Sequence, residues 1–302
     1  MKVLVDADSL VYLVGFAGQT SDYNVTILEK RDGETLLVDM LTVHGLDEVG
    51  AIESQLQEGQ WIEKEHFVTE EPLAHTLASC KRSLLAIRDA IYLEHKIPVT
   101  SFDLYLTGTG NHRDDYAQVR GYKANRIGTP RPVHYAAIRK YLIDTWNATV
   151  VDGCEADDIV SILAAGYEYD PDKVMIVSCD KDLTTVPGRL YNFRRRTMRV
   201  LTANEARLNF YRQMIVGDPT DNVIGVYGFG KKYAETAITA SMDETQMAQA
   251  VYEAFERSLS RVGCPYADRS ALDVMTETGI LLHMQRKPGE IWTPPALGLE
   301  GE

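Results

Sequence analysis

The sequence has few cysteines and no long apolar run, so it offers little for sulfur-ligated metal sites, disulfide frameworks or membrane spans. Only four of its 302 residues are cysteines: Cys80, Cys154, Cys179 and Cys264. Scattered cysteines without a Cys-x-x-Cys pair are typical of reduced thiols in a cytosolic protein, and there is no His or Cys pattern for zinc. No apolar run approaches the ~18 residues of a membrane span. The start lacks the basic region of a signal peptide. We therefore expect a cytoplasmic protein with no membrane partner.

Positive charge is also scarce. The chain has 31 Lys and Arg against 44 Asp and Glu, a net charge of −13, which on its face argues against nucleic acid as a partner. The deficit is local, however. Residues 19–71 contain 13 acids and 3 bases, whereas residues 110–140 contain 7 bases and 2 acids. With 45% hydrophobic residues, the length suffices for one large or two modest domains.

Carboxylates gather in two stretches that each follow a predicted strand, at 148–151 and 174–177. These acids are Glu155, Asp157, Asp158, Asp180 and Asp182. The carboxyl ends of parallel strands meet at one sheet edge, where open α/β sheets hold their sites. Five close carboxylates repel one another and would take up protons unless a cation joined them. Oxygen ligands favour Mg²⁺. The alternative is that one or two acids cap the helix predicted at 159–165 and the rest are solvated.

The first predicted strand, Lys2 to Asp6, also ends in an acid, and a helix is expected from Ser9 to Phe16. We interpret Asp6 as a metal ligand. Asp8 is explained equally well as an acid near the helix cap. An Asp-x-Asp after a first strand also occurs in phosphotransferases that form an aspartyl phosphate, so this signal alone is weak.

Basic residues are concentrated in two places. Residues 111–131 are poor in large aliphatic side chains and contain Arg113, Arg120, Tyr122, Lys123, Asn125, Arg126 and Arg131. Lys and Arg bind phosphate oxygens, and Tyr can stack on a base, although a solvated face remains the alternative. A hairpin predicted over 190–202 carries Arg194, Arg195, Arg196 and Arg199. Its turn is either a phosphate contact or a solubilising tip.

A glycine-rich turn follows a helix predicted at 203–216. Gly225, Gly228 and Gly230 precede Lys231 and Lys232, which open the next helix. Backbone N–H groups of such a turn and the helix N-terminus can hold a phosphate, although a plain turn is the alternative. Upstream of this turn, Asp218 and Asp221 are three residues apart and could reach the acidic cluster.

The remaining sequence predicts the frame around these motifs. Alternation around Asp32-Gly33 indicates a hairpin within an acidic insert at about 19–70. Helices are expected at 73–95 and 132–146, a strand at 102–107, more helix up to about 286, and a loose tail over 288–302. We expect an α/β core at 1–190 and a helical region at 191–302.

In this order the motifs resemble the phage 5′→3′ exonucleases of the flap-endonuclease superfamily, which share their fold with the nuclease domain of bacterial DNA polymerase I. The matching segments are Val5-Asp6, 122–126, 155–158, 178–183 and 217–234. The resemblance implies an α/β fold of the PIN/5′-nuclease type, with a mostly parallel central sheet flanked by helices. It also implies a helical C-terminal region with a helix–hairpin–helix-like DNA-binding motif.

The resemblance further implies metal-dependent DNA hydrolysis with two Mg²⁺ or Mn²⁺ ions. One ion would be held by Asp6, Glu155 and Asp157, and the other by Asp180, Asp182 and Asp218, with Asp158 and Asp221 nearby or bound through water. Asp157 and Asp180 would be catalytic, together with Lys123 and Arg126 over the scissile phosphate. Tyr122 would stack on a displaced base, with Arg113 and Arg120 also contacting DNA. The segment from Gly225 through Gly228 and Gly230 to Lys231 and Lys232 would grip duplex backbone, with K⁺ held at the turn.

The implied substrate is duplex DNA with a 5′ end, nick or flap, or an RNA–DNA hybrid, cut by a monomer in the host cytoplasm if the chain is phage-encoded. One position departs from the pattern, because Gly108 stands where many relatives have an aspartate at a strand end. Asp8, Asp114 or Asp115 are candidates to replace it. A PIN-type ribonuclease, a phosphotransferase and a non-catalytic duplex-binding protein remain alternatives.

Overall fold

The computed structural model describes residues 1–297, which fall into two compact units. Of the described residues, unit 1 comprises 1–9, 86–130 and 142–297, and unit 2 comprises 10–85 and 131–141. The sheet with its acidic edge and the C-terminal helices therefore share unit 1. This division differs from the boundary predicted near residue 190.

Unit 1 is built on a six-stranded sheet in the order β6-β5-β1-β7-β8-β9. The strands are β1 (Lys2–Asp6), β5 (Ser101–Thr107), β6 (Thr149–Val151), β7 (Val174–Val177), β8 (Gly188–Asn192) and β9 (Thr197–Leu201). All neighbours pair in parallel except β8 and β9, which are antiparallel. The central strands β1 and β7 are nearly continuous apolar runs, as expected of parallel strands buried on both faces. The predicted mostly parallel α/β fold is confirmed.

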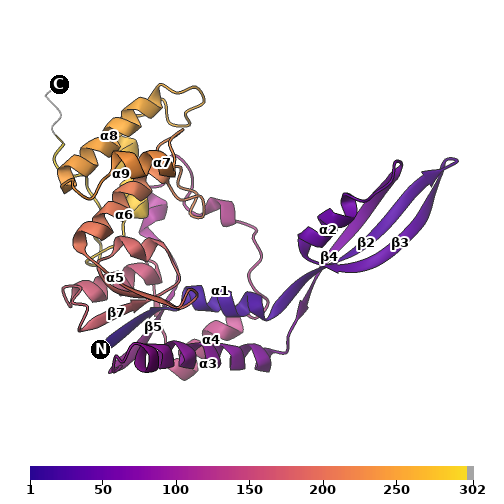
Figure 1. Cartoon of the computed structure of the whole chain (residues 1–302), viewed down its shortest axis with the longest axis horizontal. Helices are drawn as coiled ribbons and strands as arrows, with labels where there is room; N and C mark the ends of the chain where they lie inside the picture. Colours follow the sequence, from indigo (N-terminus) through magenta and orange to yellow (C-terminus); the bar gives the residue numbers. More distant parts are fainter. Residues whose placement is uncertain (298–302) are drawn as a thin grey trace. The chain divides into compact units, whose positions relative to one another are not determined.

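Helices complete unit 1. Helix α5 (Ala156–Ala165) packs on the sheet through Val160 and Ala164, which join Leu4 and Ile176 in one buried cluster. The C-terminal helices α6 (Ala203–Val216), α7 (Lys231–Ala237), α8 (Glu244–Leu259) and α9 (Ala271–Leu282) form a second core (Figure 1). Trp292 is buried in that core, against Phe210. The loose tail predicted from residue 288 is therefore wrong for the described part, and residues 298–302 lie outside it.

Unit 2 contains the predicted insert, which folds as a three-stranded antiparallel sheet. Its strands are β2 (Gln19–Arg31), β3 (Glu34–His44) and β4 (Gln60–Glu70), and helix α2 (Gly45–Glu53) lies in the connection from β3 to β4 (Figure 1). The hairpin predicted at Asp32-Gly33 is confirmed. Both residues have positive φ, 52° and 88°, the combination that two-residue hairpin turns of type I′ require.

The helices that enter and leave unit 2 also agree with the sequence pattern. They are α1 (Asp8–Ala17), α3 (Leu73–Asp89), which continues as a π-helical turn over Ala90–Glu94, and α4 (Tyr135–Trp146). Among residues 1–297, no helix combines the length and apolarity that a membrane crossing requires.

Candidate metal-binding site

The first acids of the site are placed by two adjacent parallel strands. Strand β1 ends at Asp6, and the loop that follows β7 begins at Ser178. The Ser178 hydroxyl donates to Asp6 Oδ2 at 2.7 Å and accepts from the backbone N–H of Asp180 at 2.9 Å. Asp180 Oδ1 in turn accepts from the backbone N–H of Asp182 at 2.8 Å. This chain of hydrogen bonds holds three acids at the carboxyl edge of the sheet.

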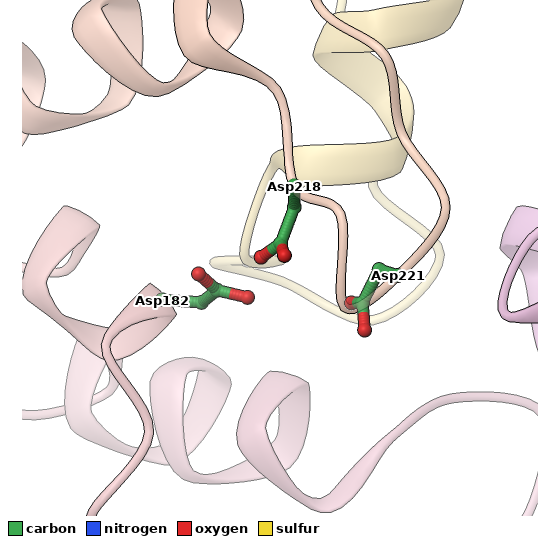
Figure 2. A group of neighbouring side chains, drawn as sticks. All are labelled: Asp182, Asp218 and Asp221. Carbon is green, nitrogen blue, oxygen red and sulfur yellow. The ribbon is translucent and has the colours of Figure 1, made fainter. Parts of the chain in front are cut away.

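A tight cluster forms where this loop meets the segment after α6. One carboxylate oxygen from each of Asp182, Asp218 and Asp221 lies within 4.8 Å of the others, and all three residues are buried. In Figure 2 the carboxylates of Asp182 and Asp218 face each other from two segments, and Asp221 lies beside Asp218. Gln213 of α6 donates through Nε2 to Asp182 Oδ1 at 2.6 Å. Such oxygens in a small buried space are a donor set suited to a hard divalent cation.

Glycines allow the second segment to fold back on itself. Gly217 has φ 73° and Gly225 has φ 67°, and their backbones are in direct contact, so that a Cβ at either position would collide with the other strand of the loop. Asp218 and Val223 exchange backbone hydrogen bonds of 2.7 and 2.8 Å across this loop. This loop places Asp218 and Asp221 beside Asp182.

Burial and mutual repulsion raise the pKa values of two acids at this edge of the sheet, Asp182 and Asp6. Burial, followed by repulsion from Asp180 and Asp218, raises the pKa of Asp182 to about 7. Burial, followed by the charge of Asp8, likewise raises the pKa of Asp6 to about 7. Carboxyl groups with such raised pKa values keep protons near neutral pH. A cation can bind to these groups in exchange for the protons.

Glu155, the residue before α5, is linked to the cluster by Tyr122. The Tyr122 hydroxyl lies 2.8 Å from Glu155 Oε2 and 2.9 Å from Asp221 Oδ2. Lys123 forms an ion pair with Glu155 and lies 3.7 Å from Asp221 Oδ2, and Arg126 donates to Asp221 Oδ1 at 2.6 Å. Burial alone would raise the pKa of Glu155, but the charges of Lys123 and Arg113 outweigh it and lower that pKa.

The prediction that Tyr122 stacks on a base is wrong in this structure. Its ring is buried in the core of the C-terminal helices, and its hydroxyl joins two acids. Tyr122 therefore fixes the positions of the Glu155 and Asp221 carboxylates and does not offer its ring to a base. Asp157, in the first turn of α5, is close enough to Glu155 and Asp158 for their charges, after burial, to raise its pKa well above the ordinary value.

Arg113 and Asp158 have a structural role, which corrects their predicted assignments as DNA contact and metal ligand. Arg113 is fully buried and pairs through both terminal nitrogens with Asp158, at 2.6 and 2.9 Å. It also donates to the backbone carbonyls of Leu281 and His283. Asp158, also fully buried, accepts in addition from the backbone N–H of Gln285 at 3.0 Å. Neither side chain is free to meet a substrate or an ion.

The other predicted DNA contacts divide into exposed and buried residues. Arg120, Gly228, Gly230, Lys231 and Lys232 are exposed. Gly225 is buried, and its carbonyl accepts from the Tyr266 hydroxyl at 2.9 Å. Gly225 therefore serves the packing of the turn, and its predicted contact with DNA is not supported by its position.

Gly108 leaves no room for the aspartate that the resemblance would place there. A Cβ at this position would lie 2.7 Å from the backbone carbonyl oxygen of Val151 and would also collide with the Asp152 carboxylate, which accepts from the backbone N–H and hydroxyl of Thr109. Of the candidate replacements, Asp8 lies beside Asp6 and accepts from the Thr107 N–H at 2.9 Å. Asp114 and Asp115 are exposed. Asp8 is thus the replacement that the structure places nearest to the acids.

Sequence reasoning missed the polar residues that position the acids. The amide of Gln213, the hydroxyl of Ser178 and the ammonium of Lys181, which lies 2.8 Å from Asp218 Oδ2, were given no role of their own. Ser178 and Lys181 lie inside a recognisable motif, which is a signal that could have found them. Gln213 stands in the middle of an ordinary helix, and nothing in the sequence marks it.

Known proteins share the sequence pattern in part. The chain is 31% identical over 114 residues to an exodeoxyribonuclease of Enterobacteria phage T3 and to an exonuclease of Escherichia phage T7. The matches cover 36% of this chain and 37% and 38% of those relatives, so the matched part spans just over a third of their length. A thermostable DNA polymerase I of Thermus caldophilus is 32% identical over 126 residues, 37% of this chain and 15% of the polymerase. No protein-family model matches.

Among solved structures, the T5 D15 protein co-crystallised with metal ions is 17% identical to this chain, with a TM-score of 0.46. The overlap covers 68% of this chain and 82% of that protein. The predicted resemblance to phage exonucleases is confirmed at the level of the sequence by the T3 and T7 proteins.

Proposed function

We propose that this chain, similar in sequence to phage exonucleases, is a divalent-metal-dependent 5′ nuclease that hydrolyses DNA phosphodiester bonds at a 5′ end or flap. One observation carries the proposal. Carboxylate oxygens of Asp182, Asp218 and Asp221, from segments far apart in the sequence, are buried within 4.8 Å of one another. Exonuclease relatives with 31% identity support it.

The residues of the site fit one or two hard divalent cations, for which we propose Mg²⁺ or Mn²⁺. Asp182, Asp218 and Asp221 would hold one ion, with Asp180 beside them. Asp6, Glu155 and Asp157 would hold a second ion, whereas among the described residues the one group of three with ligand atoms within 4.8 Å of one another is Asp182, Asp218 and Asp221. When bound, such ions lower the pKa of an attacking water and stabilise the charge on the attacking and leaving oxygens.

Lys123 and Arg126 are the cations that we propose to contact the scissile phosphate. Both already lie against the acids, Lys123 on Glu155 and Arg126 on Asp221. A phosphate beside these acids would compete for the same N–H donors. Both residues would thus orient the phosphate and balance its charge. The exposed Lys231 and Lys232, after the turn at 225–230, would contact the backbone of the duplex away from the cleaved bond.

A digest of end-labelled DNA tests the proposal. We expect blunt, nicked and 5′-flapped duplexes to be cut with Mg²⁺ and left intact with a chelator, and an RNA–DNA hybrid included in the set would show whether RNA is also removed. Asp180→Ala should abolish cleavage, a loss of at least about 10³-fold, while binding of the duplex persists. Asp172→Ala, at an exposed acid outside the site, is the matched control. Unchanged cleavage by Asp180→Ala, or cleavage that survives chelation, would overturn the two-metal assignment.

A further inference from the structure

The turn between β8 and β9 carries positive charge that the proposed chemistry does not use. Residues 193–199 contain four arginines and no acid. Arg194, Arg195 and Arg196 are all exposed. None of them has an ion-pair partner within residues 1–297, in contrast to Lys123 and Arg126, which are paired with acids of the site.

Sheet topology places this turn at the same edge as the acids. Strand β8 runs parallel to β7, with Tyr191 opposite Val177, so both strands end at the edge that carries Asp180. The backbone N–H of Ser178 donates to the carbonyl of Tyr191 at 3.2 Å. The β8–β9 turn therefore extends from the sheet next to the loop that holds the acids.

Side-chain contacts tie the turn to that loop. Asn192 Nδ2 lies 3.5 Å from the carbonyl of Cys179, and Asn192 Oδ1 accepts from the backbone N–H of Arg195 at 2.9 Å. The arginines are thus held near the acidic loop on a fixed support.

The conformation of the turn gives no reason for an arginine at position 196. Arg196 has φ 52°, in the left-handed region that favours Gly or Asn. An arginine here carries a steric cost that glycine would not.

We propose that Arg194, Arg195 and Arg196 form a second binding site for phosphates, which holds the backbone of the nucleic acid whose neighbouring phosphodiester lies in the acidic site. This rests on the proposed nuclease function. Three guanidinium groups with no acidic partner among residues 1–297 are suited to successive phosphates of one strand, because each can make bidentate hydrogen bonds to a phosphate. Contacts of this kind give affinity without sequence preference.

The test compares binding of a fluorescent 5′-flapped DNA duplex, in EDTA, by the parent and by R194A/R195A/R196A over a range of KCl concentrations. We expect affinity at low salt to fall roughly tenfold or more, and the slope of log K against log [salt] to flatten by about 2 to 3. Replacing the three arginines with lysine should keep the slope. K81A/R82A/R88A removes the same charge from exposed positions on α3 and should change neither quantity.

Arg196→Gly keeps the test informative if the triple variant is unstable. Glycine relieves the left-handed strain, so the melting temperature should stay equal or rise while the DNA affinity falls. In Mg²⁺, the triple variant should raise KM for cleavage and leave kcat within about threefold, because the turn holds substrate away from the reacting atoms.

Equal affinity and equal salt slope in the parent and R194A/R195A/R196A would overturn the proposal, as would a parent that binds no DNA. The proposed function fails separately. A parent that binds the duplex with the expected arginine dependence but cuts nothing in Mg²⁺ would leave the phosphate site standing and remove the nuclease.

Discussion

Arg113 shows how a single buried side chain connects distant parts of unit 1. Its guanidinium joins Asp158 at the start of α5 to the carbonyls of Leu281 and His283 at the end of α9. The pair is fully enclosed. Burying both charges is costly, so the pair contributes little net stability, but removing one partner leaves a buried charge uncompensated.

Arg113→Ala is therefore expected to lower the free energy of unfolding by about 3–5 kcal/mol, measured by urea denaturation. Arg120→Ala, at an exposed arginine in the same segment, should change it by less than about 0.5 kcal/mol. The double variant R113M/D158L, which replaces the pair by apolar side chains, should recover much of the loss. A loss below about 1 kcal/mol in Arg113→Ala would show that the pair is not needed for folding.

At this scale the sequence identified the acids better than their roles. Asp6, Glu155, Asp180 and Asp218 follow strand or helix ends, and a pattern of strand ends is visible in a sequence. The sequence did not reveal that Asp158 pairs with Arg113 instead of binding a metal ion, because the two residues are 45 positions apart in the chain. Tyr122 could not be assigned either, since burial of its ring depends on helices formed a hundred residues later.

The insert at about 19–70 has a buried cluster of its own and can be expected to fold independently of the sheet in unit 1. Strands β2 to β4 and α2 enclose their own buried cluster of Val25, Val43 and Val49. Its two ends lie side by side, because Thr20 pairs with Thr69 and the backbone N–H of Glu71 donates to the Gly18 carbonyl at 2.9 Å. Gln19 also pairs with Glu70, so a short turn between these two residues could replace residues 20–69.

Replacing residues 20–69 with Asn-Gly should leave a protein that unfolds cooperatively and cuts DNA within about threefold of the parent rate. The deletion removes 11 acids and 3 bases, so affinity for DNA should not fall. The checks are circular dichroism on heating and the end-labelled digest. Val25→Asp in the full chain tests the same prediction, because it disrupts only the buried cluster of the insert and should likewise leave DNA cleavage intact. A folded deletion variant that no longer cuts DNA would show that the insert takes part in the reaction.

Elements with strong local signals were predicted well. Continuous apolar runs identified β1 and β7, and an Asp-Gly pair identified the β2–β3 turn. The predicted boundary near residue 190 differs from the structure because α6 to α9 share unit 1 with the sheet, through contacts that no local pattern records. The tail was mispredicted for a similar reason. Trp292 packs against Phe210 and Gly279, and the residues next to it in the sequence give no sign of this contact.

For the whole molecule, a net charge of −13 is a poor guide to what the protein binds. Much of the excess lies in residues 19–71, and further acids are drawn together at the sheet edge, where unpaired arginines extend beside them. A surface can therefore attract phosphate while the chain as a whole is strongly acidic, provided that cations neutralise the clustered acids.

The clustered acids also predict how stability depends on pH and metal. Asp6 and Asp182 have pKa values of about 7 in the folded protein, far above those of unfolded aspartates. Between about pH 4 and pH 7 the folded state thus binds protons that the unfolded state has lost, so its stability should fall as pH rises through this window. Bound Mg²⁺ would replace those protons and restore the stability that is lost as the pH rises.

Thermal unfolding with saturating MgCl₂ and with EDTA should therefore show a large upward shift of Tm by Mg²⁺ at about pH 8 and little or none at about pH 5. Asp182→Asn removes one titrating ligand, so it should raise the Tm in EDTA at the higher pH and shrink the gain from Mg²⁺. Asp172→Asn, at an exposed acid, should behave like the parent. An equal Mg²⁺ shift at both pH values would mean that the ion binds elsewhere, because protons and cation would then not compete for the same carboxylates.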